Sequence, residues 1–155
     1  MTYSRTMNLA LIALFFAVAC SVTATRAAEP SPVGRWVTFN HRTNAPNGII
    51  EIKLDHGSLQ GTVVQMLNRP AALAPAICHS CPGTLKNAPV VGLTILWGLK
   101  KSGDADWDGG SILDPNSGNI YSAKVELQDS GQKLLVRGYL GIALLGRTEV
   151  WQRQN

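Results

Sequence analysis

Two cysteines separated by two residues form the most conspicuous chemical motif of the chain. The run Cys78-His79-Ser80-Cys81 fits a disulfide, a redox dithiol, half of a zinc site or a haem attachment. Haem attachment requires a histidine directly after the second cysteine, where the chain has Pro82. Zinc needs four ligands, and a redox dithiol is usually found at a helix N-terminus in a βαβ unit. We therefore favour a local disulfide between Cys78 and Cys81, with redox or metal chemistry as the alternatives.

An acidic run offers a second possible chemistry. The residues Asp104-Ala105-Asp106-Trp107-Asp108-Gly109 match the first half of a calcium-binding loop. The bidentate glutamate expected at its twelfth position falls on Pro115. We therefore expect an acidic hairpin loop here, and we predict neither a metal nor a cofactor for the chain.

A third group of residues consists of polar and aromatic side chains that would suit a ligand pocket. Its members are Gln65, Trp97, Tyr121, Arg137 and Tyr139. The chain has no G-x-S-x-G, H-E-x-x-H or glycine-rich phosphate motif, which favours a binding protein over an enzyme. The simpler alternative is that these five residues belong to the core or the surface.

The elements that must position these residues are β-strands. Residues 51–55 and 121–128 alternate polar and apolar with the period of two that indicates a half-buried strand. Turn-forming residues such as those at 56–57, 114–118 and 129–131 separate the runs. The sequence predicts eight strands, near residues 34–40, 48–55, 58–67, 92–99, 107–113, 119–128, 133–140 and 146–153.

Eight strands joined mostly by short turns predict an all-β, up-and-down antiparallel barrel over residues 29–155. Closure removes the exposed edges of the sheet. A barrel in the outer membrane is disfavoured because faces that carry Lys53, Lys124 and Glu126 do not suit lipid. In the predicted topology, the connection 68–91, the turn at Asp114-Pro115 and the loop 141–146 meet at one open end. The connection 68–91 would be the candidate lid of a ligand entrance.

The first 28 residues read as an export signal that is cleaved near residues 24–28. Arg5 precedes the apolar stretch 9–19, which is too short to span a membrane. Cleavage before residue 25 removes Arg5 and lowers the formal net charge from +4 to +3. The basic residues form no stripe, so we expect no nucleic-acid partner. We predict a periplasmic protein that does not span the membrane, with lipidation of Cys20 as a minor alternative.

The first and last predicted strands of the barrel domain each carry a short tryptophan-containing motif. Gly34-Arg35-Trp36 opens the first strand and Trp151-Gln152-Arg153 closes the last, a combination that resembles lipocalins and the wider calycins. In an eight-stranded barrel these segments lie side by side. We therefore predict that Gly34, Trp36, Trp151 and Arg153 plug one end, with Arg153 stacked on Trp36.

Further runs carry a resemblance to one family. These runs are residues 92–98, 109–115, 118–121, 136–141 and 146–151. They resemble a family of exported proteobacterial proteins of unknown function, over about residues 32–153. The resemblance implies a lipocalin-like barrel in the periplasm and brings no established activity.

Because an eight-stranded barrel can hold one small ligand or be filled by side chains, we expect a module that binds a small apolar ligand. The runner-up is an envelope interaction protein with a filled barrel, and an enzyme with a dispersed site comes third.

Overall fold

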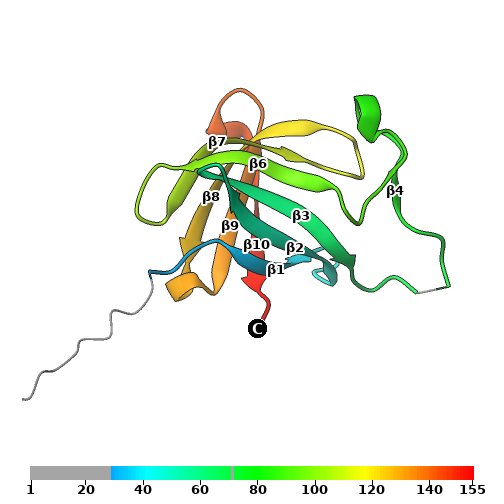
Figure 1. The fold of residues 1–155 in the computed structure, drawn as a ribbon, viewed down its shortest axis with the longest axis horizontal. Helices are drawn as coiled ribbons and strands as arrows, with labels where there is room; N and C mark the ends of the chain where they lie inside the picture. Colours follow the sequence, from blue (N-terminus) through cyan, green and yellow to red (C-terminus); the bar gives the residue numbers. More distant parts are fainter. Residues whose placement is uncertain (1–28, 71) are drawn as a thin grey trace, which may run out of the picture.

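The chain folds into a closed antiparallel barrel of eight strands (Figure 1). The computed structural model describes residues 29–70 and 72–155. The predicted signal segment, with its cleavage sites and Cys20, lies outside the described residues. The barrel strands are β1 (Gly34–Phe39), β2 (Pro46–Asp55), β3 (Ser58–Met66), β6 (Thr94–Lys101), β7 (Asp106–Leu113), β8 (Ile120–Gln128), β9 (Lys133–Tyr139) and β10 (Gly146–Arg153).

The order of the strands around the barrel confirms the predicted up-and-down topology. Each strand pairs with its sequence neighbours in the barrel, and β1 closes the ring by pairing with β10 through Trp36 opposite Arg153. The predicted strand at 92–99 begins at Thr94 instead. Gly92 has a φ of +98°, so the chain is still turning there and cannot yet continue a regular strand.

Buried side chains from all eight barrel strands form one core cluster, which Cys78, Cys81, Val90 and Leu93 of the β3–β6 connection extend. Trp36 and Trp151 are among its largest members and are 0% and 1% exposed. Inward and outward residues alternate along the strands, as in β8, where Ala123, Val125 and Leu127 are buried between exposed neighbours. Side chains from each strand therefore fill the interior and stabilise the fold through apolar burial.

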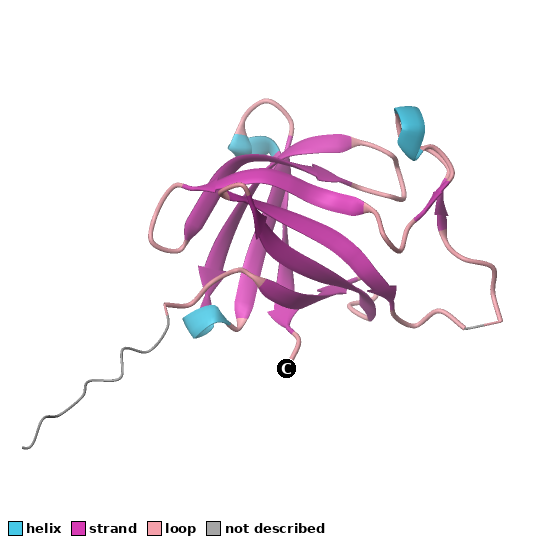
Figure 2. Cartoon of the chain, in the orientation of Figure 1, coloured by secondary structure: helices cyan, strands magenta, loops and turns pink. Residues whose placement is uncertain are grey.

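A long connection joins β3 to β6, and we call its residues 67–93 the strap. It contains two short strands, β4 (Ile77–Cys78) and β5 (Ala88–Pro89), which pair with each other, and the 3₁₀ turn η1 (Gly83–Leu85) (Figure 2). Two other single 3₁₀ turns, η2 (Asp129–Gly131) and η3 (Ala143–Leu145), lie in the β8–β9 and β9–β10 loops. Within residues 29–70 and 72–155 we find no helix of the length and apolarity needed to cross a membrane.

Candidate functional site

One end of the barrel is closed by Arg153, the last residue of β10. Its guanidinium carbon lies 4.3 Å from the centroid of the Trp36 ring. The guanidinium donates hydrogen bonds to the carbonyl oxygens of Gly131, Val33 and Ser31, at 2.5, 3.1 and 2.5 Å. Burial lowers the pKa of Arg153 below its ordinary value, but an arginine stays charged in proteins. This cation–π contact and its hydrogen bonds join the N-terminal segment, the β8–β9 turn and β10.

A glycine and two buried tryptophans accompany Arg153 at this end. Gly34 has a φ of +133°, and a Cβ there would lie 2.7 Å from Nη1 of Arg153. The Trp36 indole N–H donates to the carbonyl oxygen of Pro32 at 2.8 Å. Among the described residues, the Trp151 indole N–H is buried without a hydrogen-bond partner. Such an unpaired donor costs about 1–3 kcal/mol.

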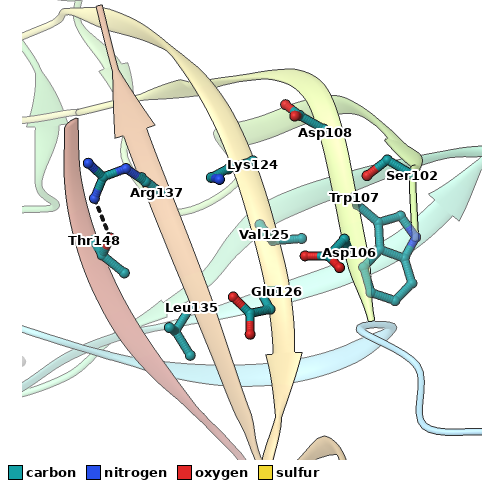
Figure 3. A pocket seen from close by; sticks show the side chains of 10 residues that line it. All are labelled: Ser102, Asp106, Trp107, Asp108, Lys124, Val125, Glu126, Leu135, Arg137 and Thr148. Carbon is teal, nitrogen blue, oxygen red and sulfur yellow. Dashed lines mark hydrogen bonds between the residues drawn. The ribbon is translucent and has the colours of Figure 1, made fainter. Parts of the chain in front are cut away.

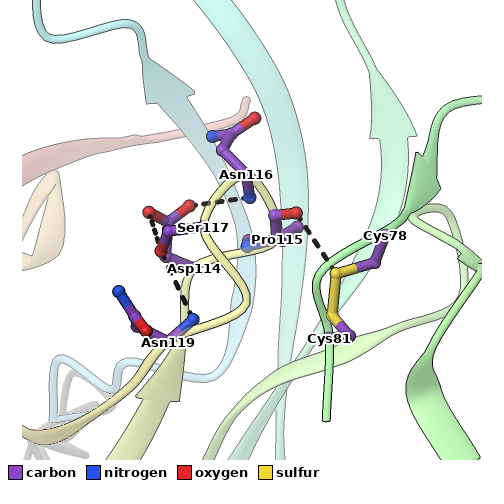
Figure 4. The surroundings of a disulfide bond; sticks show 7 residues. All are labelled: Cys78, Cys81, Asp114, Pro115, Asn116, Ser117 and Asn119. Atoms are coloured by element: carbon purple, nitrogen blue, oxygen red, sulfur yellow. Dashed lines mark hydrogen bonds between the residues drawn. A yellow bond between two sulfur atoms is a disulfide. The ribbon is translucent and has the colours of Figure 1, made fainter.

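At the opposite end of the barrel, a disulfide closes a short loop within the strap, which confirms the predicted bond between Cys78 and Cys81. The two Cα atoms are 5.4 Å apart and both residues are buried. Sγ of Cys78 lies 3.2 Å from the carbonyl oxygen of Pro115, in the β7–β8 turn (Figure 4). A Cβ on Gly118 in the same turn would collide with the carbonyl group of Ser80. The disulfide loop therefore packs directly against this turn.

Backbone hydrogen bonds hold the two halves of the strap together and attach its C-terminal end to β3. The N–H of Val90 donates to the carbonyl of Ala76, and the N–H of Gly92 donates to the carbonyl of Val63 in β3, both at 2.8 Å. The Val63 N–H in turn donates to the carbonyl of Leu93 at 2.9 Å. The strap is thus attached to the barrel at β3 and at the β7–β8 turn.

A hollow of about 280 Å³ lies between the strap and the end of β3, and we call it the strap groove. None of its lining residues belongs to the core cluster, although Met66 and Ala76 pack against it, so the groove lies outside the filled interior. Its lining is mostly apolar, with Gln65 and Arg69 as the polar members. The lining residues are Val64, Gln65, Met66, Arg69, Pro70, Leu73, Pro75, Ala76, Pro89 and Val91.

A second hollow, of about 380 Å³, lies over β7–β10 and is much more polar (Figure 3). We call it the wall hollow. Acidic and basic side chains share it. Figure 3 shows Asp106 and Asp108 apart from Arg137, with Lys124 between them. Its lining residues are Ser102, Asp106, Trp107, Asp108, Lys124, Val125, Glu126, Leu135, Arg137 and Thr148.

The five predicted pocket residues do not meet in one hollow. Gln65 lines the strap groove and Arg137 lines the wall hollow, whereas Trp97, Tyr121 and Tyr139 line neither. Tyr121 shares the inward face of β8 with the buried Ala123 and Val125. Arg137 and Tyr139 lie on the opposite face of β9 from the buried Val136, and so point away from the interior.

The acidic run lies in the hairpin between β6 and β7. Asp104 is in the loop, while Asp106 and Asp108 belong to β7. One carboxylate oxygen of Asp108 accepts a hydrogen bond from the Gly109 N–H at 2.6 Å. Within residues 29–70 and 72–155, no three histidine, cysteine or acidic side chains gather in a way that would hold a metal ion.

An ion-paired carboxylate lies on the outside of the barrel in β2. Hydrogen bonds from Lys53, at 2.8 Å, and Arg35, at 3.3 Å, lower the pKa of Glu51 below its ordinary value. The side chains of Arg35 and Lys53 are exposed, so these two ion pairs add little to stability at neutral pH.

The fold places the chain in a structural class. The closed eight-stranded barrel is similar to that of the Helicobacter pylori protein HP1028, which is described as belonging to the lipocalin family. The TM-score is 0.70 at 18% sequence identity, over 81% of this chain and 84% of that protein. The fold is therefore lipocalin-like. The chain itself belongs to the bacterial family DUF2147, described as uncharacterized protein conserved in bacteria, whose match spans residues 34–153. None of the curated proteins compared with the chain matches it.

Most of the strap groove escapes prediction from the sequence. Of its lining residues, only Gln65 is predicted as a pocket residue, although the strap itself is predicted to frame a ligand entrance. The one available signal is the clustering of prolines and small apolar residues at 70–76, within a connection too long to be a simple turn.

Proposed function

We propose that this is an exported, lipocalin-like binding protein that holds a small, largely apolar ligand in the strap groove, outside the filled barrel. The observation that carries this proposal is the groove itself. Apolar side chains from β3 and from residues 73–76 and 89–91 of the strap form its wall, and the polar side chains of Gln65 and Arg69 lie among them. Ligand sites are typically concave and apolar, with a few polar groups that orient the ligand.

The size and lining of the groove define the class of ligand. Its volume of about 280 Å³ is near the lower limit of known ligand pockets, about 300 Å³. At about 30 Å³ for each water-sized group, it accommodates about nine non-hydrogen atoms. The amide of Gln65 and the guanidinium of Arg69 favour a ligand with one polar or acidic end. A short aliphatic or aromatic acid has this chemistry.

The proposed location is the periplasm. Two features support it: the apolar, uncharged stretch at residues 9–19, and the disulfide, which is typical of oxidising compartments. The protein is proposed to bind its ligand without transforming it.

A second candidate function is that of an envelope interaction protein that works through its surface. The observation that favours it is the core cluster, to which all eight strands contribute and which leaves the interior to side chains. The first candidate function requires a small molecule in the strap groove, whereas the second requires none.

Native mass spectrometry of the protein purified from its own periplasm tests the proposal. We expect a bound small molecule on the wild type and its loss in Leu73→Asp, because a carboxylate in the groove wall disfavours an apolar ligand. The matched control is Leu54→Asp. Leu54 is 62% exposed in β2, whereas Leu73 is 55% exposed in the groove. A wild type without bound ligand, or equal retention by Leu73→Asp, would contradict the proposal.

A further inference from the structure

The β9–β10 loop exposes a run of apolar side chains. Residues 140–145, which we call the apolar tip, have the sequence LGIALL and contain no polar side chain. Leu140, Ile142, Leu144 and Leu145 are 63%, 60%, 85% and 77% exposed. The loop projects beyond the ends of β9 and β10, at the top of Figure 1. A contiguous exposed apolar surface of this kind marks a site of interaction.

The apolar tip is held in place by Arg137 of β9. Its Nε donates to the carbonyl oxygen of Ala143 at 2.7 Å, and its Nη2 donates to that of Leu144 at 3.3 Å. Its Nη1 donates to Oγ1 of Thr148 at 2.9 Å. Within the tip, the Leu145 N–H donates to the carbonyl of Ile142 at 3.1 Å. These bonds satisfy backbone groups that would be costly to bring into an apolar medium, while the leucine side chains stay exposed.

Charge is distributed unequally between the two ends of the barrel. At the end that carries the apolar tip, the loops contain three basic residues, Arg42, Arg69 and Lys86, and one acidic residue, Asp114. These loops are residues 40–45, 67–93, 114–119 and 140–145. At the plugged end, the described loop and terminal residues are 29–33, 56–57, 102–105, 129–132 and 154–155. They contain three acidic residues, Glu29, Asp104 and Asp129, and no lysine or arginine.

We propose that the open end of the barrel docks on the surface of an anionic phospholipid bilayer, with the apolar tip in the boundary between headgroups and acyl chains. Charge complementarity carries the choice of partner. An anionic surface attracts the basic end, which orients the tip toward the lipid. The plugged end has no such excess of positive charge, because Lys101, Lys133 and Arg153 at the adjoining strand ends only offset the acidic residues there. Amphipathic helices that lie at membrane surfaces likewise combine leucines with arginine or lysine. Arg137 and Arg147 flank the tip, although Arg147 also pairs with Glu149 at 3.4 Å.

The size of the tip favours lipid over a folded protein partner. A stable protein interface uses about 20–30 residues on each side. The tip offers four apolar side chains on six residues. A projecting loop of this size is sufficient for interfacial insertion, in which each buried side chain adds affinity independently of shape complementarity.

Vesicle sedimentation tests the docking. The full mature protein is mixed with vesicles of phosphatidylglycerol and phosphatidylcholine, and separately with vesicles of phosphatidylcholine alone. We expect binding to the anionic vesicles that weakens with salt, and at least a fivefold weaker affinity for phosphatidylcholine. The double substitution Leu144→Ser and Leu145→Ser should lower the affinity for anionic vesicles about 30-fold. The matched control, Leu54→Ser at the other end, should change it less than twofold.

A second measurement reports the orientation directly, because it follows the surroundings of a label at the tip and does not compare affinities. A polarity-sensitive fluorophore is attached to Leu144→Cys, and separately to Leu54→Cys as the control. Phosphatidylglycerol vesicles should shift the emission of the first label to shorter wavelength and leave the second unchanged. Equal binding to both kinds of vesicle, no binding, or equal shifts at the two labels would overturn the proposal. A shift at residue 144 that rises with protein concentration in the absence of lipid would instead indicate a contact between copies of the chain.

Discussion

Replacing Arg153 with methionine should weaken the barrel substantially, because this side chain ties the N-terminal segment and the β8–β9 turn to β10. Methionine keeps much of the apolar stem that packs on Trp36 and removes the charge and all of the donors. The carbonyl oxygens of Gly131, Val33 and Ser31 lose their partner. The perturbation therefore isolates the hydrogen bonds and the cation–π contact from apolar burial.

The magnitude follows from the surroundings of each contact. The bond to Gly131 is partly buried, and a hydrogen bond to a charged group is worth about 1.5–3 kcal/mol. The bonds to Val33 and Ser31 are exposed, so each contributes less to the free energy of unfolding. The stacking at 4.3 Å contributes about 1 kcal/mol. The total loss is about 3 kcal/mol, which corresponds to a Tm about 12 °C lower in a domain of this size.

Urea unfolding followed by tryptophan fluorescence measures this loss, and Trp36 reports the same region. The matched control is Arg147→Met on the same strand, where one exposed ion pair at 3.4 Å is lost and the change should stay below about 1 kcal/mol. Arg153→Lys should fall between wild type and Arg153→Met, because one ammonium cannot reach three carbonyls. If Arg153→Met and Arg147→Met lowered stability equally, the assignment of Arg153 to the plug would be refuted.

Three other predictions follow from the strap and from the outer face of the barrel. The double substitution Cys78→Ser and Cys81→Ser should cost about 2 kcal/mol from the short disulfide loop and free the strap. Hydrogen exchange should then rise over residues 76–93 and not over β8–β10, and collapse of the whole barrel would contradict this. Gly118→Ala should displace the disulfide loop and destabilise the protein by about 1–3 kcal/mol in a urea titration. An unchanged midpoint would show that the close packing at this turn is absent. Because the pKa of Glu51 is lowered in the folded protein, its contribution is present above the unfolded pKa and disappears as the pH falls through the folded pKa. The Tm difference between wild type and Glu51→Gln should therefore shrink toward zero with acidification, and a difference that grows would reverse the sign of this linkage.

The barrel can be predicted because its determinants are local and periodic. The run Tyr121 to Gln128 alternates without interruption, and β8 reproduces it over Ile120–Gln128. The plug residues can also be paired from the sequence, since closure of an eight-stranded barrel brings Arg153 next to Trp36. Where local pattern and topology agree, the sequence is a sufficient guide.

The candidate site is less accessible from the sequence, for two different reasons. Arg137 is predicted in a ligand pocket, although the period of two already puts it on the face opposite Val136. The alternation of β9 in the sequence is therefore enough to place Arg137 outside the barrel. The strap groove has no such signal, since it exists only because the two-residue strands β4 and β5 fold the strap against β3. Contacts between segments far apart in the chain, such as the strap and β3, produce no periodic pattern in the sequence from which they could be predicted.

The most direct test of the central claim is a titration of methyl-labelled protein with a short aliphatic acid such as hexanoate, followed by NMR. We predict that methyl resonances of Val64, Leu73 and Val91 in the strap groove shift together and saturate. The interior methyl groups of Val125 and Val136 should stay unchanged, because the core cluster fills the barrel. Saturable shifts confined to the interior would show that the ligand enters the barrel after all, and would contradict binding in the strap groove.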